Sequence, residues 1–529
     1  MTNASTAPTS SSKSVDYFCT DDLHANLASQ TARGGRYTVA SLSFNFLVTA
    51  VSTIWLTREL MPADFGLYGM VLPLVNFASM FVDLGLSRAV VQKPQITHEQ
   101  VSTLFWINLA ISALLSLLMA AATPLVVAFY REPQLATLNL AMSGLFIITG
   151  LTLQHRALLQ RRMEFGKINA VAAIAPLTAA VVAITIALMG GRYWALVALL
   201  TVSHLTTCLG MWIACRWRPG LPRRGTGVRE MLTFGGHVTG FQFINYFARN
   251  ADNVMLGYVW GKVPLGIYTR AYSLMMLPVG KLMTPLDQVL VPTLSRLVDN
   301  PERYRLFYRS ALTLVATVCT FSAVAFILIS PELIPLVLGE KWREIVPLFL
   351  ALSPAVLVAC TNSASSWLYL SFGHVNRQSL AGAINATFMV AAMLIGLPYG
   401  PLGMAIAVSI SRVTAKLPYV AYSCQGTAIT IKDYVSAIFW PTWVPVISAL
   451  GAFFGSLLLA QLYLFPKQSF SAPWEALPIS PSQALLIISV KLTLWIALLG
   501  LTVVLIPAAR SAVVVEPLKL LRRLVNKKN

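Results

Sequence analysis

Three positively charged side chains lie inside two neighbouring, strongly apolar segments, 231–258 and 264–294, where a charge is costly. They are Arg249, Arg270 and Lys281. A charge at the centre of a bilayer costs about 2.5–3.5 kcal/mol on insertion scales, so it usually faces a cavity or a partner. Arg270 and Lys281 are close to three helical turns apart and therefore share one helix face. These cations predict a positively charged lining that suits an anionic group such as a pyrophosphate.

Two apolar segments also carry a polar stripe, with side chains at steps of three or four residues. Such spacing places all members of a stripe on one helix face. In segment 37–57 the stripe is Ser41, Asn45, Thr49 and Ser52, and in segment 231–258 it is Gln242, Asn245, Arg249 and Asp252. We expect these two faces to meet across a water-filled central cavity.

Other interpretations of these charges stay open at the level of sequence. Arg249 and Asp252 are close enough along the chain to form a local ion pair. Arg270 is near one end of its segment, so its long side chain can reach the membrane surface instead. Lys491, in the last apolar segment, is expected at the interface or against lipid headgroups.

The composition shows which elements must position these residues. Of the 529 residues, 56% are hydrophobic and 11% are charged, whereas soluble domains carry roughly 25% charged residues. A mean hydropathy of +0.69 over this length excludes a water-soluble globule. The net charge of +19 is explained by basic loops on the cytoplasmic side of a membrane. We therefore expect an all-α polytopic membrane protein that does not bind nucleic acid.

About fourteen segments are long and apolar enough to cross a bilayer as helices. We place them at 37–57, 69–90, 101–129, 135–154, 168–189, 193–215, 231–258, 264–294, 306–329, 345–370, 378–397, 401–423, 435–463 and 484–507. Of the 39 Lys and Arg residues, 28 are assigned to one side of the membrane and seven to the other. Arg412, Lys416 and Lys432 are counted among the 28. This asymmetry predicts a cytoplasmic N-terminus and C-terminus.

An internal repeat relates the two halves of the chain. Gly34-Gly35 matches Gly235-Gly236, Asn45 matches Asn245, and Gly66-Leu67-Tyr68 matches Gly266-Ile267-Tyr268, at an offset of 200 or 201. Six segments separate the copies, so the repeat is parallel, with its pseudo-two-fold axis along the membrane normal. We expect a disordered cytoplasmic tail over 1–32 and two six-helix lobes over 33–225 and 226–425. Two additional helices would follow over 426–508, and a basic cytoplasmic tail over 509–529.

Motifs for built-in chemistry are missing from the sequence. There is no Walker A motif, HExxH, GxSxG or pair of carboxylates at catalytic spacing, and the six cysteines are scattered without metal-ligand spacing. We therefore predict no enzyme, no metal and no cofactor. A membrane protein without these motifs that moved a solute would take its energy from an ion gradient, from the solute's own gradient or from downstream consumption of the solute.

Several motifs resemble the opening of bacterial polysaccharide flippases. They are the stretch from Leu60 to Tyr68, the run from Asp83 to Ser87, and the stretch from Asn250 to Gly257 with the following Gly266-Ile267-Tyr268. Over roughly residues 35–425 the chain is similar to the O-antigen, capsule and colanic-acid branch of the multidrug/oligosaccharidyl-lipid/polysaccharide exporter superfamily. The resemblance implies a bilobed protein of the bacterial inner membrane that works by alternating access.

The implied cargo is an oligosaccharide repeat unit on undecaprenyl pyrophosphate, and a polysaccharide polymerase and chain-length machinery are possible partners. The cationic cavity of such proteins corresponds here to Arg249, Arg270 and Lys281, with Asn45 and Asn245 as further contacts. Asp252 is a candidate for coupling to a proton or sodium ion. The alternatives are an exporter of peptidoglycan precursor or drugs, a membrane enzyme of polysaccharide assembly, and a non-transporting scaffold.

Overall fold

The computed structural model describes residues 27–93, 95–223, 246, 250–463 and 480–515. Within them every regular element is a helix. The first half of the chain contains α1 (Leu27–Glu59), α2 (Pro62–Asp83), α3 (Leu86–Gln92), α4 (His98–Ala121), α5 (Thr123–Tyr130), α6 (Leu135–Ser143), α7 (Leu145–Arg161), α8 (Phe165–Leu188) and α9 (Trp194–Ala214). Residues 250–260 are also helical.

The second half contains α11 (Lys262–Ser295), α12 (Pro301–Leu338), the short turn η2 (Glu340–Trp342), α13 (Ile345–Ala359), α14 (Asn362–Ser371) and α15 (Val375–Gly396). After the short turn η3 (Leu397–Tyr399) come α16 (Gly400–Cys424), α17 (Ile431–Tyr463), α18 (Pro481–Leu505), α19 (Pro507–Arg510) and the single turn η4 (Ser511–Val515). Several predicted segments are two helices with a break. One break has a clear backbone cause, because Leu84 and Gly85 between α2 and α3 both adopt positive φ angles, of 46° and 74°.

The chain is an all-helical multi-pass membrane protein, as predicted. Ten helical stretches of the described residues are long and apolar enough to cross a membrane. The number fourteen stays a prediction, and most of the predicted segment 231–258 lies outside the described residues. The predicted tail boundaries at 1–32 and 509–529 also fall largely outside them.

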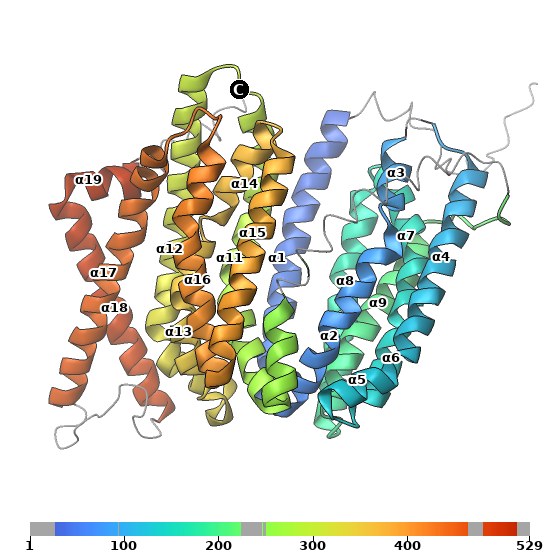
Figure 1. Cartoon of the computed structure of the whole chain (residues 1–529), viewed down its shortest axis with the longest axis horizontal. Helices are drawn as coiled ribbons and strands as arrows, with labels where there is room; N and C mark the ends of the chain where they lie inside the picture. Colours follow the sequence, from blue (N-terminus) through green and yellow to red (C-terminus); the bar gives the residue numbers. More distant parts are fainter. Residues whose placement is uncertain (1–26, 94, 224–245, 247–249, 464–479, 516–529) are drawn as a thin grey trace, which may run out of the picture.

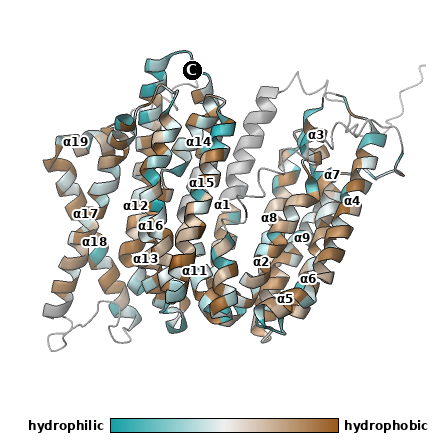
Figure 2. Ribbon diagram, viewed as in Figure 1, coloured by the Kyte–Doolittle hydropathy of each residue, from teal (hydrophilic) through white to brown (hydrophobic). Residues whose placement is uncertain are grey.

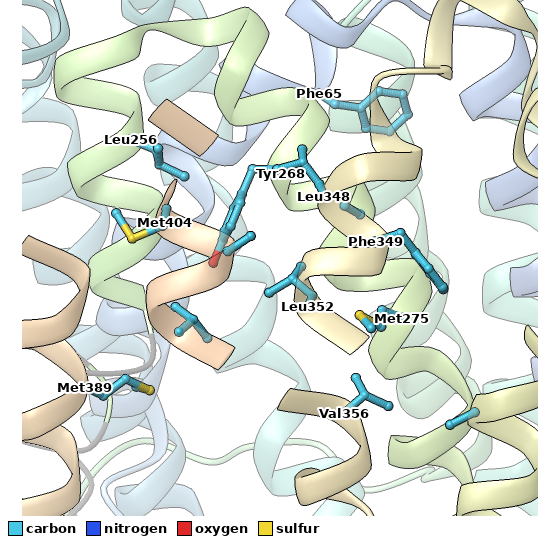
Figure 3. Close-up of a cluster of buried hydrophobic side chains, with 14 of the residues drawn as sticks. Phe65, Leu256, Tyr268, Met275, Leu348, Phe349, Leu352, Val356, Met389 and Met404 are labelled. Atoms are coloured by element: carbon cyan, nitrogen blue, oxygen red, sulfur yellow. The ribbon is translucent and has the colours of Figure 1, made fainter. Parts of the chain in front are cut away.

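The helices form two groups that stand side by side (Figure 1). One group holds α2 to α9, the other holds α11 to α18, and α1 lies between them. Apolar residues cover most of the length of the helices (Figure 2), as expected for surfaces in contact with lipid. A large buried cluster joins the groups, because Phe65 of α2 belongs to the same cluster as Leu348 and Leu352 of α13 (Figure 3).

Helices α17 and α18 pack against α12, and a buried ion pair links α18 to it. The ammonium group of Lys491 lies 2.7 and 2.8 Å from the two carboxylate oxygens of Glu332, and the Lys491 residue is only 2% exposed. The expectation of an interfacial Lys491 was therefore wrong. The predicted segment 306–329 ended too early, whereas α12 continues through Glu332 to Leu338 and brings a carboxylate opposite the lysine.

Replacing Lys491 with Met is expected to destabilise the folded protein by about 3–5 kcal/mol, because Glu332 would keep a buried charge without its partner. The double variant Lys491→Met/Glu332→Leu should recover much of that loss. Thermal unfolding of the purified protein in detergent measures both. Arg223→Met is the control, because the Arg223–Glu99 pair is much more exposed and should contribute about 1 kcal/mol or less. Equal losses of stability in both single variants would contradict a buried ion pair between Lys491 and Glu332.

Candidate functional site between the two helix groups

Helices α2 and α11 cross at their first turns with the backbones in direct contact. The two helices pack against each other. They begin at Pro62 and Lys262, which are equivalent positions of the repeat. A Cβ atom on Gly66 would lie 1.7 Å from the carbonyl oxygen of Lys262, and a Cβ on Gly266 would lie 1.9 Å from that of Pro62. Real Cβ contacts are never this short. Glycine is therefore required on both sides of the crossing.

The crossing is reciprocal, and this reciprocity matches the sequence repeat. Gly66 faces Lys262 and Gly266 faces Pro62, so each contact becomes the other when 200 is added to or subtracted from the residue numbers. A pseudo-two-fold axis that passes between two parallel helices produces such a pair of contacts. The repeated motif Gly-x-Tyr thus marks the place where the two groups of helices touch.

Polar contacts surround the crossing at the same end of the molecule. Lys262 forms an ion pair of 2.9 Å with Glu132, in the turn before α6. From the turn between α12 and α13, Trp342 donates a 2.7 Å hydrogen bond to the carbonyl of Thr57, and Lys341 donates one of 3.0 Å to that of Glu59. We call this set the lobe seal: Thr57, Glu59, Gly66, Glu132, Lys262, Gly266, Lys341 and Trp342.

Arg270 lies next to the lobe seal and contacts the other helix group. Its guanidinium carbon is 3.9 Å from the centre of the Phe65 ring, and Phe65 packs edge-on against Trp342 at 5.5 Å. The Nε atom of Arg270 is buried without a hydrogen-bond partner among the described residues. Arg270 therefore stacks on an aromatic ring from α2, about two turns into α11.

Asp252 is buried in a chain of aromatic and charged side chains. It accepts a 3.0 Å hydrogen bond from the Tyr268 hydroxyl and a 2.8 Å bond from the backbone N–H of Asn253. Tyr268 stacks with Tyr272, and Arg412 of α16 donates a 2.8 Å hydrogen bond to the Tyr272 hydroxyl. Arg412 also interacts electrostatically with Asp252. The carboxylate thus has a cationic neighbour that comes from a different helix.

The sequence analysis missed Arg412 and Lys416, because it grouped both with the cytoplasmic loops. This was wrong, since α16 runs from Gly400 to Cys424 and contains both. Lys416 is buried and donates hydrogen bonds to the carbonyl of Thr361 (3.2 Å) and the side-chain oxygen of Asn362 (3.0 Å). These acceptors lie at the break between α13 and α14. The signal was present, because both residues fall inside the predicted segment 401–423.

Asp287 is a second carboxylate that the sequence analysis did not place in the site. It accepts hydrogen bonds from the Trp367 indole (2.7 Å) and the Ser363 hydroxyl (3.2 Å), both on α14. Asp287 therefore ties α11 to α14 within one helix group. No pattern in the sequence of α11 alone identifies these partners.

The remaining predicted site residues are only partly described. Asn45 is half-buried, with its side-chain oxygen lacking a partner among the described residues. Ser41, one turn earlier, donates a hydrogen bond to the Asn169 carbonyl of α8, so that end of the stripe packs against the first helix group. Asn245 and Arg249 lie outside the described residues, and for Lys281 the structure describes the helical backbone alone.

The structure thus brings some of the predicted residues together around α11. Asp252 contacts one face of this helix through Tyr268, whereas Arg270 leaves the helix toward Phe65. No hydrogen bond or ion pair joins Asn45 to either residue in the part of the chain that is described. The two helix groups are therefore closed against each other at the lobe seal, and charged side chains lie beside it.

Comparison with known proteins identifies the family. Residues 55–347 match the family described as polysaccharide biosynthesis protein, which is more than half of the chain. The chain belongs to this family. The matched region begins in α1, includes the whole α2–α11 crossing, and ends after the lobe seal in α13.

Relatives in the polysaccharide biosynthesis family are distant but span most of the chain. The lipopolysaccharide biosynthesis protein WzxC of Escherichia coli (strain K12) is 24% identical over 431 residues, which cover 79% of this chain and 86% of that protein. The succinoglycan biosynthesis transport protein ExoT of Rhizobium meliloti (strain 1021) is 28% identical over 343 residues, or 63% of this chain and 68% of the relative.

Solved structures share the fold. The lipid II flippase MurJ in an inward closed conformation aligns with a TM-score of 0.66 at 14% identity, over 88% of this chain and 98% of that chain. An inward-facing multidrug resistance transporter of the MATE family aligns with a TM-score of 0.57 at 14% identity, over 72% and 93%. At this identity the likeness establishes the fold and nothing more.

Replacing Gly66 with Ala is expected to loosen the lobe seal, because the new methyl group forces two backbones apart. Overpacking typically costs about 1–3 kcal/mol, which corresponds to a change of about 5- to 140-fold in an opening equilibrium. A cysteine at the fully buried Thr57, in a chain without its six native cysteines, should then react faster with a water-soluble maleimide by that factor.

Gly500→Ala is the matched control for this experiment. Gly500 is an exposed helical glycine with nothing within 4 Å of the added Cβ, so labelling of the Thr57→Cys reporter should stay at its original rate. An unchanged rate in Gly66→Ala as well would show that the crossing does not hold the two groups together.

Proposed function

We propose that the protein flips undecaprenyl-pyrophosphate-linked oligosaccharide repeat units across the bacterial inner membrane for surface polysaccharide synthesis. One observation carries this proposal. The chain belongs to the polysaccharide biosynthesis family, and its two helix groups are closed against each other at one end. A transporter that works by alternating access needs such a closure, and it must be able to open. The relatives named for lipopolysaccharide synthesis and succinoglycan transport support the same class of cargo.

The proposed cargo carries a pyrophosphate, and cations beside the lobe seal are suited to bind it. Arg249, Arg270 and Lys281 remain the candidate cationic residues, with Asn45 and Asn245 as further contacts. The position of Arg412 in the middle of α16, hydrogen-bonded to Tyr272, adds a fourth candidate. Arginine suits this role because its planar guanidinium group pairs with two phosphate oxygens at once.

The same proposal covers the source of energy, the orientation of the chain in the membrane and the partner proteins. A proton or sodium gradient would drive the cycle, with Asp252 as the coupling carboxylate beside Tyr268 and Arg412. Both termini would lie in the cytoplasm, as the distribution of Lys and Arg favours. A polysaccharide polymerase and its chain-length machinery would act on the flipped unit.

A second candidate function is the export of a different lipid or of drugs. This alternative rests only on the fold that the chain shares with the lipid II flippase MurJ and with a multidrug transporter. A membrane enzyme of polysaccharide assembly is a weaker candidate, because the sequence carries no recognisable catalytic motif.

Deletion of the gene, followed by analysis of lipid-linked oligosaccharide, distinguishes these functions. The proposed flippase requires loss of surface polysaccharide, with completed lipid-linked units trapped on the cytoplasmic leaflet. If the units reach the periplasmic leaflet but stay unpolymerised, the enzyme interpretation is correct. If polysaccharide and units are both unchanged, in a strain shown to have no second flippase, the cargo is a different lipid or a drug.

Alanine at Lys281 or Arg249 is expected to abolish polysaccharide export while the protein remains inserted at normal levels. Each variant would remove a cation that the pyrophosphate needs. Quantified surface polysaccharide, with immunoblots of the membrane fraction, measures both properties. Lys432→Ala is the control, since Lys432 is exposed at the start of α17 and should be dispensable. Normal export by both variants would disprove the cationic cavity.

A further inference from the structure

An apolar groove runs between α8 and α9 on the outside of the first helix group. Its volume is about 630 Å³. Ile174, Leu209 and Ile213 line it, and they are 53, 62 and 76% exposed. Lys167 and Arg216 line the same groove at one end. The groove therefore combines an apolar wall with a cationic mouth.

Specific residues shape this groove and close its far end. Gly210 allows α9 to approach α8, because a Cβ there would lie 2.6 Å from a methyl carbon of Val171. Thr206, which lines the groove, shares a 3.0 Å hydrogen bond with Thr178 across the two helices. The groove thus extends from the cationic mouth to this interhelical bond.

The length of the groove is close to the depth of one membrane leaflet. From Thr206 to the end of α9 at Ala214 is eight residues, or about 12 Å at the rise of an α-helix, and Arg216 lies two residues beyond that end. The hydrocarbon core of a bilayer is about 30 Å thick, so half of it is about 15 Å. A chain lying in the groove with its head at Lys167 and Arg216 would end near the bilayer midplane, as a lipid of that leaflet does.

The charges at the mouth favour an anionic headgroup. Lys167 lies in the first turn of α8 and pairs with Glu164 at 2.7 Å. Arg216 follows the end of α9 and also lines the groove. Two cations and one carboxylate leave a net positive charge, at the end that the Lys and Arg distribution assigns to the cytoplasm.

We propose that this groove binds one anionic phospholipid of the cytoplasmic leaflet. An acyl chain lies between α8 and α9, and the phosphate contacts Lys167 and Arg216. A resident phospholipid fits better than the transported lipid, because both walls come from adjacent helices of one group, away from the α2–α11 crossing.

Native mass spectrometry of the purified full-length protein in detergent tests this site. Phosphatidylglycerol and phosphatidylcholine with identical acyl chains, and a prenyl phosphate, are titrated separately. We expect retained phosphatidylglycerol at one tight site. Lys167→Gln/Arg216→Gln should lower its affinity about tenfold or more, since each cation near a membrane surface contributes about 1 kcal/mol. Arg156→Gln, an exposed cation at the same end, is the matched control.

A second pair of variants tests the apolar wall independently of charge. Ala170→Trp, at the groove edge, should exclude the acyl chain, whereas Leu177→Trp, an exposed position on α8 outside the groove, should not. Weaker binding only in Ala170→Trp and in the double charge variant supports the proposal. Equal affinity for both lipids, equal loss in Arg156→Gln, or preferential retention of a prenyl phosphate would overturn it.

Discussion

The contact on which the arrangement of helices depends is between two backbones. At Gly66 and Gly266 each helix of the α2–α11 pair meets a carbonyl group of the other. Because neither glycine has a side chain, the spacing of the two helices is set by the backbone itself. Lys262 contributes its carbonyl to this crossing and its ammonium group to the ion pair with Glu132. The crossing thus determines where the lobe seal forms.

Charged side chains hold helices together elsewhere in the molecule. Arg412 links α16 to Tyr272 of α11, Lys416 links α16 to the α13–α14 break, and Lys491 links α18 to α12. A polar group within a membrane needs a partner inside the protein, because lipid offers none. The partners here are hydroxyl, amide, carbonyl and carboxylate oxygens on neighbouring helices. Each of these charges consequently fixes which helix lies beside which.

The sequence predicted features that repeat along one chain and could not predict features that join two helices. The offset of 200 residues identified Gly66 and Gly266 as equivalent before their contact was known. By contrast, nothing in the sequence of α11 alone showed that Asp287 would accept a hydrogen bond from Trp367 of α14. Lys491 was misplaced for the same reason, since its partner depends on how far α12 extends.

The nature of the crossing also limits how the lobe seal can open. A contact made by side chains can be released when rotamers change, but Gly66 and Gly266 have no rotamers. The carbonyls of Pro62 and Lys262 can leave the glycines only if α2 and α11 separate as whole helices. Phe65 and Arg270, one on each of these helices, would then part as well. In the proposed transport cycle, release of the cargo at this end therefore requires movement of one helix group relative to the other. Arg270, which is stacked on Phe65, becomes available to an anion only when that movement occurs.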